Sequence, residues 1–316
     1  MAFKQVKLSH ISLKALEIGH VYTYPIYYKK DDDVYSILIE VNSTFTEQTK
    51  EKIDKYHIKD VFVQRKDHDE YEKDTQEYLK NIADNPNIPV ELKSEILHEM
   101  AADVIDDLLD GDINTEKIEQ ANEIIKDTVG LLLKDKNAIK AMLKVTSHDY
   151  YTYTHSVNVS TYALGFGVFL GLKEEQLNLL GKAGIMHDIG KRKINSDIIN
   201  KNGKLTDEEF NEIKKHPTYG VELLKELGET DQRLLNIVEQ HHEKIDGSGY
   251  PYGLKAQEID PFAQVMSIVD IFDALTTKRS YKDAMKSFEA FNIMHNHMKG
   301  ELNHQLLKRF MLFMSQ

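Results

Sequence analysis

Two adjacent pairs of potential metal ligands stand out in this sequence. His187-Asp188 lies within Gly-Ile-Met-His-Asp-Ile-Gly-Lys, and His241-His242 lies shortly before Gly-Ser-Gly-Tyr-Pro. Three single residues extend the set: His155, His216 and Asp270. Imidazole and carboxylate groups without thiolates suit a divalent metal that activates water rather than a structural zinc. The sequence therefore predicts a hydrolytic metal centre.

Each member of the set also has an ordinary structural interpretation. A lone His155 or His216 is more often a structural residue than a ligand. Asp270 lies in an apolar segment, 265–272, where an unpaired carboxylate would cost several kcal/mol. A metal would solve that problem, and so would a salt bridge or a hydrogen bond within the helix. The order of the whole set and the glycines around it favour the metal.

The pairs His187-Asp188 and His241-His242 are expected at the ends of helices. Neighbouring side chains in the middle of a helix diverge by about 100°, so two adjacent ligands converge more easily where a helix breaks. Gly247, Gly249 and Pro251 predict such a break shortly after His242.

The elements that must position these residues are helices. From about residue 146 onward nearly every segment has helical periodicity, with packed helices expected over 156–170 and 174–186. Thr206 and Glu209 form a capping-box pattern. The helix that starts there is predicted to carry His216 near its end, just before Pro217.

The preceding sequence divides into two parts. Residues 1–66 are predicted to form a small mixed α/β regulatory or assembly module, with a hairpin of strands at 21–28 and 34–41, a helix at 47–56 and a strand at 59–63. Residues 67–145 are predicted to form a helical linker region, interrupted at 85–89. Its acidic side chains form either a solvated face or a surface for a partner or a dimer.

Composition excludes several classes of protein. The 316 residues carry a formal net charge of −12, which argues against a duplex nucleic acid partner. The absence of cysteine excludes disulfides, cysteine-ligated zinc and iron–sulfur centres. No apolar run reaches the roughly 18 residues that span a bilayer, and no signal peptide is visible. We expect a cytoplasmic protein with no membrane span.

The segment from about 146 to 283 resembles the HD-GYP family of HD-superfamily metal-dependent phosphohydrolases. The resemblance is carried by YTYTHSVNV at 151–159, HDIGK at 187–191, NGKLT at 202–206, HP at 216–217, HHEKIDGSGYP at 241–251, DIFDALT at 270–276 and RSYK at 279–282. It implies an all-α catalytic domain, an HD-domain helical bundle, at 146–316. The activity it implies is hydrolysis of cyclic di-GMP to linear pGpG and, in many members, GMP, in bacterial second-messenger signalling.

The resemblance also implies two divalent metal ions, iron or manganese. One metal would be held by His155, His187, Asp188 and Asp270. The second would be held by His216, His241 and His242, with Asp188 bridging the pair. Family members with a third metal have a glutamate where this chain has Tyr151, so the resemblance predicts two.

Four further residues resemble the substrate contacts of the family. The first is Lys191, which would bind a phosphate oxygen or help to protonate the leaving ribose oxygen, unless it is a surface lysine. Lys191 and the metal ligand Asp188 are the predicted catalytic residues. Arg279 and Lys282, three residues apart, would contact phosphate and guanine. Tyr250 would cover the nucleotide or pack against the metal ligands.

Two alternatives to a cyclic di-GMP phosphodiesterase remain open. The chain could be a cyclic di-GMP receptor with little turnover, although a degenerate receptor would be expected to have lost ligands or Lys191. It could also cleave another cyclic dinucleotide, such as cyclic GMP-AMP. A homodimer through the N-terminal module or the helical linker, and a signalling protein partner, are further expectations.

Overall fold

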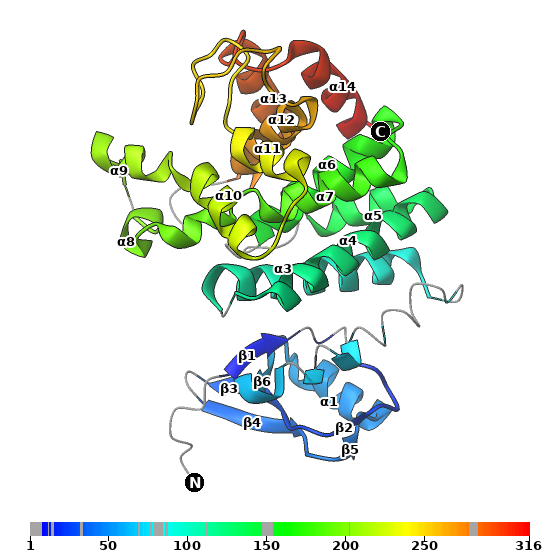
Figure 1. The fold of residues 1–316 in the computed structure, drawn as a ribbon. Coiled ribbons are helices and arrows are strands. Elements are labelled where there is room, and N and C mark those ends of the chain that lie inside the picture. Colours follow the sequence, from blue (N-terminus) through cyan, green and yellow to red (C-terminus); the bar gives the residue numbers. More distant parts are fainter. Residues whose placement is uncertain are drawn as a thin grey trace. The chain divides into compact units, whose positions relative to one another are not determined.

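The computed structural model describes residues 8–316 apart from 12, 14–15, 32–33, 69, 72, 76–77, 79–84, 86–87, 112, 147–153, 202 and 278–283. The chain divides into two compact units, Met1–Asp103 and Val104–Gln316 (Figure 1). No helix among the described residues combines the length and the apolar character needed to cross a membrane.

The first unit contains a four-stranded antiparallel sheet in the order β1-β6-β3-β4. Its strands are β1 (Leu8–Ile11), β3 (Ile26–Asp31), β4 (Val34–Ile39) and β6 (Val61–Gln64). A second pair joins β2 (Val21–Tyr22) to β5 (Ser43–Thr44). The described part of this region also contains α1 (Glu47–Tyr56) and the short 3-10 helix η2 (Arg65–Asp67). The predicted small α/β module and its helix at 47–56 are confirmed. The predicted hairpin is found between β3 and β4, but residues 21–22, which were expected in its first strand, pair with β5 instead, and β3 extends to Asp31.

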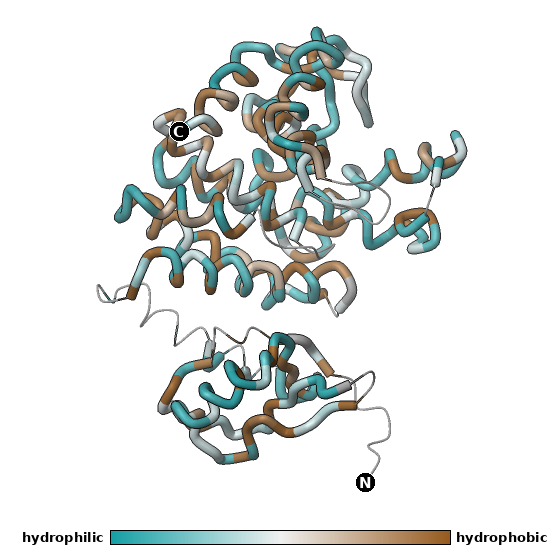
Figure 2. Tube along the Cα trace, turned by 180° about the vertical axis from the view of Figure 1, so that it is seen from behind, coloured by the Kyte–Doolittle hydropathy of each residue, from teal (hydrophilic) through white to brown (hydrophobic). Residues whose placement is uncertain are grey.

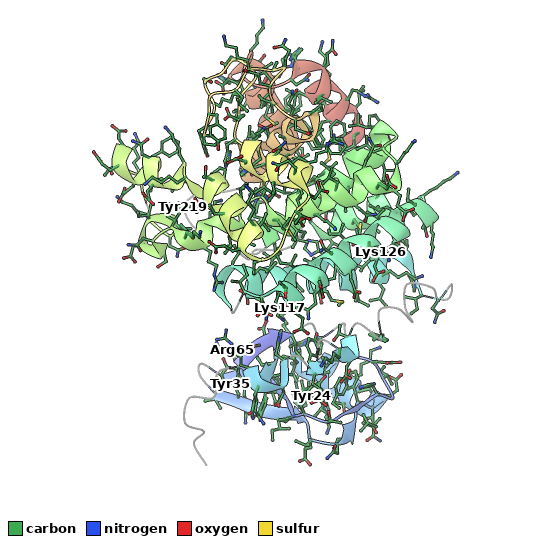
Figure 3. All side chains as sticks on the ribbon, in the orientation of Figure 1. Tyr24, Tyr35, Arg65, Lys117, Lys126 and Tyr219 are labelled. Carbon is green, nitrogen blue, oxygen red and sulfur yellow. The ribbon has the colours of Figure 1, made fainter. Side chains whose placement is uncertain are left out.

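The core of this unit is aliphatic and aromatic. Ile11, Ile26, Val61 and Val63 are fully buried, and they belong to one cluster with several tyrosines. Tyr24 lies in the same cluster and donates a hydrogen bond of 2.9 Å to Asp74 (Figure 3). Burial of the Tyr24 hydroxyl, together with the charge of Asp74, raises its pKa far above the usual value. These contacts stabilise the module, and none of them indicates a chemical role for it.

The helix α3 (Val90–Asp110) begins next to Pro89, as predicted, and contains the division between the two units. Lys117 of the following helix forms an ion pair of 2.8 Å with Asp107 near the end of α3 (Figure 3). The helices that follow in the predicted linker belong to the second unit. The division between the two units lies within α3, inside the predicted linker. The predicted domain limits, at residues 66 and 145, stay a prediction.

The second unit is helical throughout the described residues. Its elements are α4 (Thr115–Lys134), α5 (Ala138–Val145), α6 (Thr154–Leu170), α7 (Glu174–Met186), η3 (Ile189–Lys193), α8 (Ser196–Ile199), α9 (Asp207–Ile213), α10 (His216–Glu226), α11 (Gln232–Gln240), α12 (Pro261–Thr276), α13 (Ser287–Asn296) and α14 (His304–Met314). α6 packs against α7 and α12, while α7 also contacts α4 and α11. The predicted all-α bundle is confirmed.

The α6 helix lies at the centre of this bundle because it is apolar on every side. All of its residues from 156 to 167 are buried, as expected for a helix without a polar face. Small residues let its neighbour approach closely, since a Cβ built on Gly184 of α7 would lie 2.5 Å from the Cα of Ser160. By contrast, hydrophilic and hydrophobic positions alternate along the outer helices (Figure 2).

One sequence prediction about a helix is wrong. Thr206 and Glu209 do form the capping box that starts α9, but α9 ends at Ile213. His216 instead begins the next helix, α10, with Pro217 in the first turn. Proline is well suited to that position because the first N–H groups of a helix need no partner within it.

Substitution of Phe310 tests whether the C-terminal helix α14 belongs to the hydrophobic core of the second unit. Its ring is fully buried and packs at about right angles against Phe272, 5.2 Å away. We expect Phe310→Ala to lower the free energy of unfolding of the second unit by about 3–5 kcal/mol. Phe288→Ala, at a side chain that is 82% exposed, should change it by less than about 0.5 kcal/mol. Urea denaturation measures both, and similar effects for the two variants would contradict the assignment.

Candidate metal centre

The structure brings all seven predicted ligands together from five helices. His155 lies on α6, His187-Asp188 follows α7, and His216 begins α10. His241-His242 follows α11, and Asp270 lies on α12. Nitrogen and oxygen atoms within 4.8 Å of one another form two groups that share Asp188: His155, His187 and Asp188, and Asp188, His216, His241 and His242.

Three of the histidines are oriented by the backbone of the helix that precedes them. The Nδ1 atom of His187 lies 2.8 Å from the carbonyl oxygen of Gly184. In His216, Nδ1 lies 2.7 Å from the carbonyl oxygen of Ile213. In His241, Nδ1 lies 2.6 Å from the carbonyl oxygen of Val238. Carbonyls in the last turn of a helix lack intrahelical partners and can only accept. Nδ1 therefore carries the proton, and Nε2 keeps a free lone pair.

His155 is oriented by a carboxylate instead. Its Nδ1 atom lies 2.7 Å from Oδ2 of Asp273, which is completely buried. The other oxygen of Asp273 accepts a hydrogen bond from Thr277. Asp273 lies within the DIFDALT segment at 270–276, but no role was predicted for it. Its position three residues after Asp270, on the same face of a helix, is the signal that could have identified it.

The two central carboxylates remain charged although they are buried. Burial would raise the pKa of Asp188, but Lys191 and His187 outweigh it and hold that pKa well below its usual value. Lys191 contacts Oδ2 of Asp188 directly. Burial likewise opposes ionisation of Asp270, while its hydrogen bond with His155 and the nearby His242 lower its pKa.

The imidazoles divide into neutral and charged groups. Burial lowers the pKa of His216 to about 3 and that of His242 to about 4, and it holds the pKa of His241 well below 6.5. Burial acts in the same direction on His155, but the hydrogen bonds with Asp270 and Asp273 raise its pKa to about 9. At neutral pH the rings of His216, His241 and His242 are therefore already uncharged, as metal ligation requires.

Two buried atoms of the cluster fit a metal ion. Nε2 of His187 and Oδ1 of Asp188 are buried without a hydrogen-bond partner among the described residues. A buried polar atom without a partner is unfavourable, and a cation placed against both would remove that cost. Oδ1 of Asp188 also lies 3.3 Å from Nε2 of His216. The donor set, nitrogen and carboxylate oxygen, can hold divalent metal ions.

Close backbone contacts fix the segment that carries Asp188. A Cβ built on Gly190 would lie 2.0 Å from the carbonyl oxygen of His216 and 2.3 Å from the amide nitrogen of Gly220. Only glycine fits between η3 and α10. Arg192, two residues later, donates hydrogen bonds to the carbonyls of Leu108 and Leu109 at the end of α3.

The predicted substrate contacts have different outcomes. Lys191 lies at the centre, with a third of its side chain exposed. The ring of Tyr250 lies 4.7 Å from that of His242 at an angle of 33°, and burial raises the pKa of Tyr250. Tyr151, Arg279 and Lys282 lie outside the described residues.

Gly190→Ala tests the close contact between η3 and α10. The added methyl group must displace the backbone of His216, so we expect loss of Mn²⁺ binding and a decrease of about 1–3 kcal/mol in stability. Gly130 on α4 is the matched control, because a Cβ there meets nothing within 4 Å. Gly130→Ala should keep Mn²⁺ binding and gain about 0.5–1 kcal/mol from helix propensity. Isothermal titration calorimetry measures the Mn²⁺ affinity of each variant. Equal affinities would show that the close contact between η3 and α10 is not needed for metal binding.

Metal binding should depend on pH through His155. The folded pKa of about 9 exceeds the ordinary 6.5, so His155 stabilises the metal-free protein fully below about pH 6.5, and this contribution is lost as the pH rises through 9. Ligation requires the unprotonated ring, so the apparent Mn²⁺ affinity should rise about tenfold per pH unit between 6.5 and 9. Asp273→Asn should lower the pKa of His155 and flatten this dependence. If the Mn²⁺ affinity of the unaltered chain did not change with pH, His155 would not be a ligand that must lose a proton before it binds the metal.

The chain is similar to several known proteins. The sequence model of the HD domain family matches residues 119–304. A cyclic di-GMP phosphodiesterase of Pseudomonas aeruginosa is 33% identical over 190 residues, covering 60% of this chain and 46% of that protein. A 3'3'-cGAMP-specific phosphodiesterase of Vibrio cholerae is 36% identical over 151 residues, covering 46% of this chain and 27% of that protein.

The match to these curated relatives thus spans less than half of their length. A solved structure, the HDG"Y"P protein Bd1817 of Bdellovibrio bacteriovorus, has the same fold with a TM-score of 0.74 and 18% identity, covering 98% of this chain and all of that one. More than half of this chain matches the HD domain family, and the sequence relatives are cyclic dinucleotide phosphodiesterases. The chain therefore belongs to the HD domain family and, within it, to the HD-GYP branch.

Proposed function

We propose that this chain is a metal-dependent phosphodiesterase that hydrolyses cyclic di-GMP to linear pGpG. The observation that carries the proposal is the position of Asp188, whose carboxylate is shared by two groups of imidazoles. A shared carboxylate is suited to a pair of metal ions because its two oxygens can contact different cations. The names of the sequence relatives support a cyclic dinucleotide as the substrate.

Two cations, iron or manganese, are the proposed cofactors. His155, His187 and Asp270 would hold one, His216, His241 and His242 the other, and Asp188 would contact both. Such a pair supplies Lewis acidity that lowers the pKa of water and offsets charge on a phosphoryl group. Nitrogen and carboxylate ligands without thiolates are compatible with both metals.

The side chains have the ionisation states that metal ligands require. Asp188 and Asp270 are already ionised, and the rings of His216 and His241 are held neutral with Nε2 unprotonated. Lys191 now contacts Asp188. Bound cations would offset the charge of that carboxylate, and the ammonium group of Lys191 would then be available to donate to a phosphate oxygen or to the leaving ribose oxygen.

The remaining contacts are proposed from the sequence. Arg279 and Lys282 would bind phosphate and guanine, and Tyr250 would border the nucleotide from its place beside His242. The first unit would have a regulatory or assembly role, through a homodimer or a signalling protein partner. A cytoplasmic location stays a prediction.

A second candidate substrate is 3'3'-cGAMP, because the relative from Vibrio cholerae is named as specific for it. The two substrates differ in one base, so they share the phosphodiester chemistry of the centre. A receptor that binds cyclic di-GMP without cleaving it is the other alternative. All of the proposed ligands and Lys191 are present, which favours an enzyme.

Turnover tests the proposal directly. The protein is purified anaerobically, loaded with Fe²⁺ or Mn²⁺ and supplied separately with cyclic di-GMP and 3'3'-cGAMP, and products are separated by chromatography. We expect pGpG from cyclic di-GMP at the higher kcat/KM. Faster cleavage of 3'3'-cGAMP would reassign the substrate, and binding without cleavage by the fully loaded protein would favour the receptor.

Asp188→Ala tests the shared carboxylate. We expect loss of metal binding and a decrease in rate of roughly a thousandfold or more, because a group that contacts both cations cannot be replaced by its neighbours. Asp197→Ala, at an exposed aspartate on α8, is the matched control and should keep both properties. Retained hydrolysis in Asp188→Ala would refute the bridging role.

A further inference from the structure

Glu243 directly follows the proposed ligand His242 and is buried, with 3% of its surface exposed. Both oxygens of its carboxylate accept hydrogen bonds from a loop further along the chain. Oε1 accepts from the backbone N–H of Tyr252 at 2.7 Å and of Gly253 at 3.1 Å, and Oε2 accepts from Leu254 at 2.9 Å. Three consecutive amides thus converge on one carboxylate, an arrangement that stabilises a buried negative charge.

The same loop is packed tightly against the end of α11. The N–H of Tyr250 donates to the carbonyl of His242 at 3.3 Å. A Cβ built on Gly249 would lie 2.6 Å from that oxygen and 2.5 Å from the Cα of Glu243. The loop therefore touches the backbone of the ligand pair on one side and the carboxylate of Glu243 on the other.

This packing places an aromatic ring beside a proposed ligand. The ring of Tyr250 lies 4.7 Å from that of His242 and 6.4 Å from that of His216. His242 also differs from the other ligands after helix ends. Its Nδ1 atom faces Asp270 at 3.8 Å, whereas Nδ1 of His241 is fixed by a backbone carbonyl. The orientation of His242 thus depends more on its neighbours in the loop.

We propose that Glu243 is a positioning residue, which ties residues 250–254 to the end of α11 so that Tyr250 supports the ring of His242. It would act on the group of ligands formed by His216, His241 and His242, and not on His155 or His187. The inference rests on the proposed metal-dependent function, because it assigns Glu243 to the binding of the second cation.

A glutamate is required by this geometry. Glutamine keeps one accepting oxygen but turns an NH₂ group toward the N–H of Leu254, so two donors would face each other. Aspartate is one methylene shorter and cannot reach the same three amides without movement of the loop. Glu243→Gln is therefore the smallest change that breaks the link, since it preserves volume and removes one acceptor and the charge.

The experiment compares Glu243→Gln with the unaltered chain of 316 residues. Hydrogen exchange should show that the amides of 252–254 are protected in the unaltered chain and exchange at least about tenfold faster in the variant, while amides of α11 stay protected. Titration with Mn²⁺ alone should show one equivalent bound as before and the other bound about tenfold more weakly.

Glu239→Gln is the matched control. Glu239 accepts a hydrogen bond of 2.6 Å from the hydroxyl of the same Tyr252, but this bond is exposed and involves the side chain of Tyr252 rather than its backbone. It should match the unaltered chain in exchange and in Mn²⁺ binding. Tyr250→Leu removes the supporting ring and leaves the carboxylate in place, so it should weaken the same Mn²⁺ equivalent even if Glu243→Gln does not fold.

The outcomes separate this inference from the proposed function. Unchanged Mn²⁺ binding in both Glu243→Gln and Tyr250→Leu would overturn the positioning role, and so would freely exchanging amides at 252–254 in the unaltered chain. If the unaltered chain binds Mn²⁺ but cleaves no cyclic dinucleotide, the proposed function fails while weaker binding in the variants still supports the role of Glu243.

Discussion

The second unit depends on keeping one shared carboxylate charged while it is buried. Asp188 is 4% exposed and lies between two groups of imidazoles. A buried charge without partners costs several kcal/mol, so the helices around it must bring compensating groups within a few ångströms. His187, His216 and Lys191 do this from α7, α10 and η3. The glycines that let these segments touch are as important to the centre as the ligands themselves.

Helix ends explain why the ligands could be recognised in the sequence. Adjacent ligands converge more easily where a helix breaks, and both pairs follow the last residue of a helix. For His241-His242 the helix ends just before the pair, although the glycines predicted a break shortly after it. The same ends supply free carbonyls that orient the histidines. His216 was placed wrongly because proline was interpreted as the end of one helix, although it is equally favourable in the first turn of the next.

Two supporting carboxylates could not be identified in the same way. Asp273 meets His155 across 118 positions of sequence, and Glu243 binds amides 9 to 11 residues ahead. Both contacts depend on the three-dimensional course of the chain, and the only local signal for either is the spacing of Asp273 three residues after Asp270 on one helix face. The small α/β module was predicted well because hairpins and short helices are local, but its sequence gives no chemistry and its structure shows a packed core.

The net charge of −12 and the proposed anionic substrate are compatible only if the centre is locally positive. The described ligands supply carboxylates and imidazoles, and His155 must lose its proton before it can bind a metal, so the positive charge must come from bound cations together with Lys191. Anomalous X-ray diffraction from Mn²⁺-loaded crystals tests this most directly. We predict two peaks, one beside His155 and His187 and one beside His216 and His241, with the carboxylate of Asp188 in contact with both. A single peak, or two peaks of which only one touches Asp188, would contradict the account.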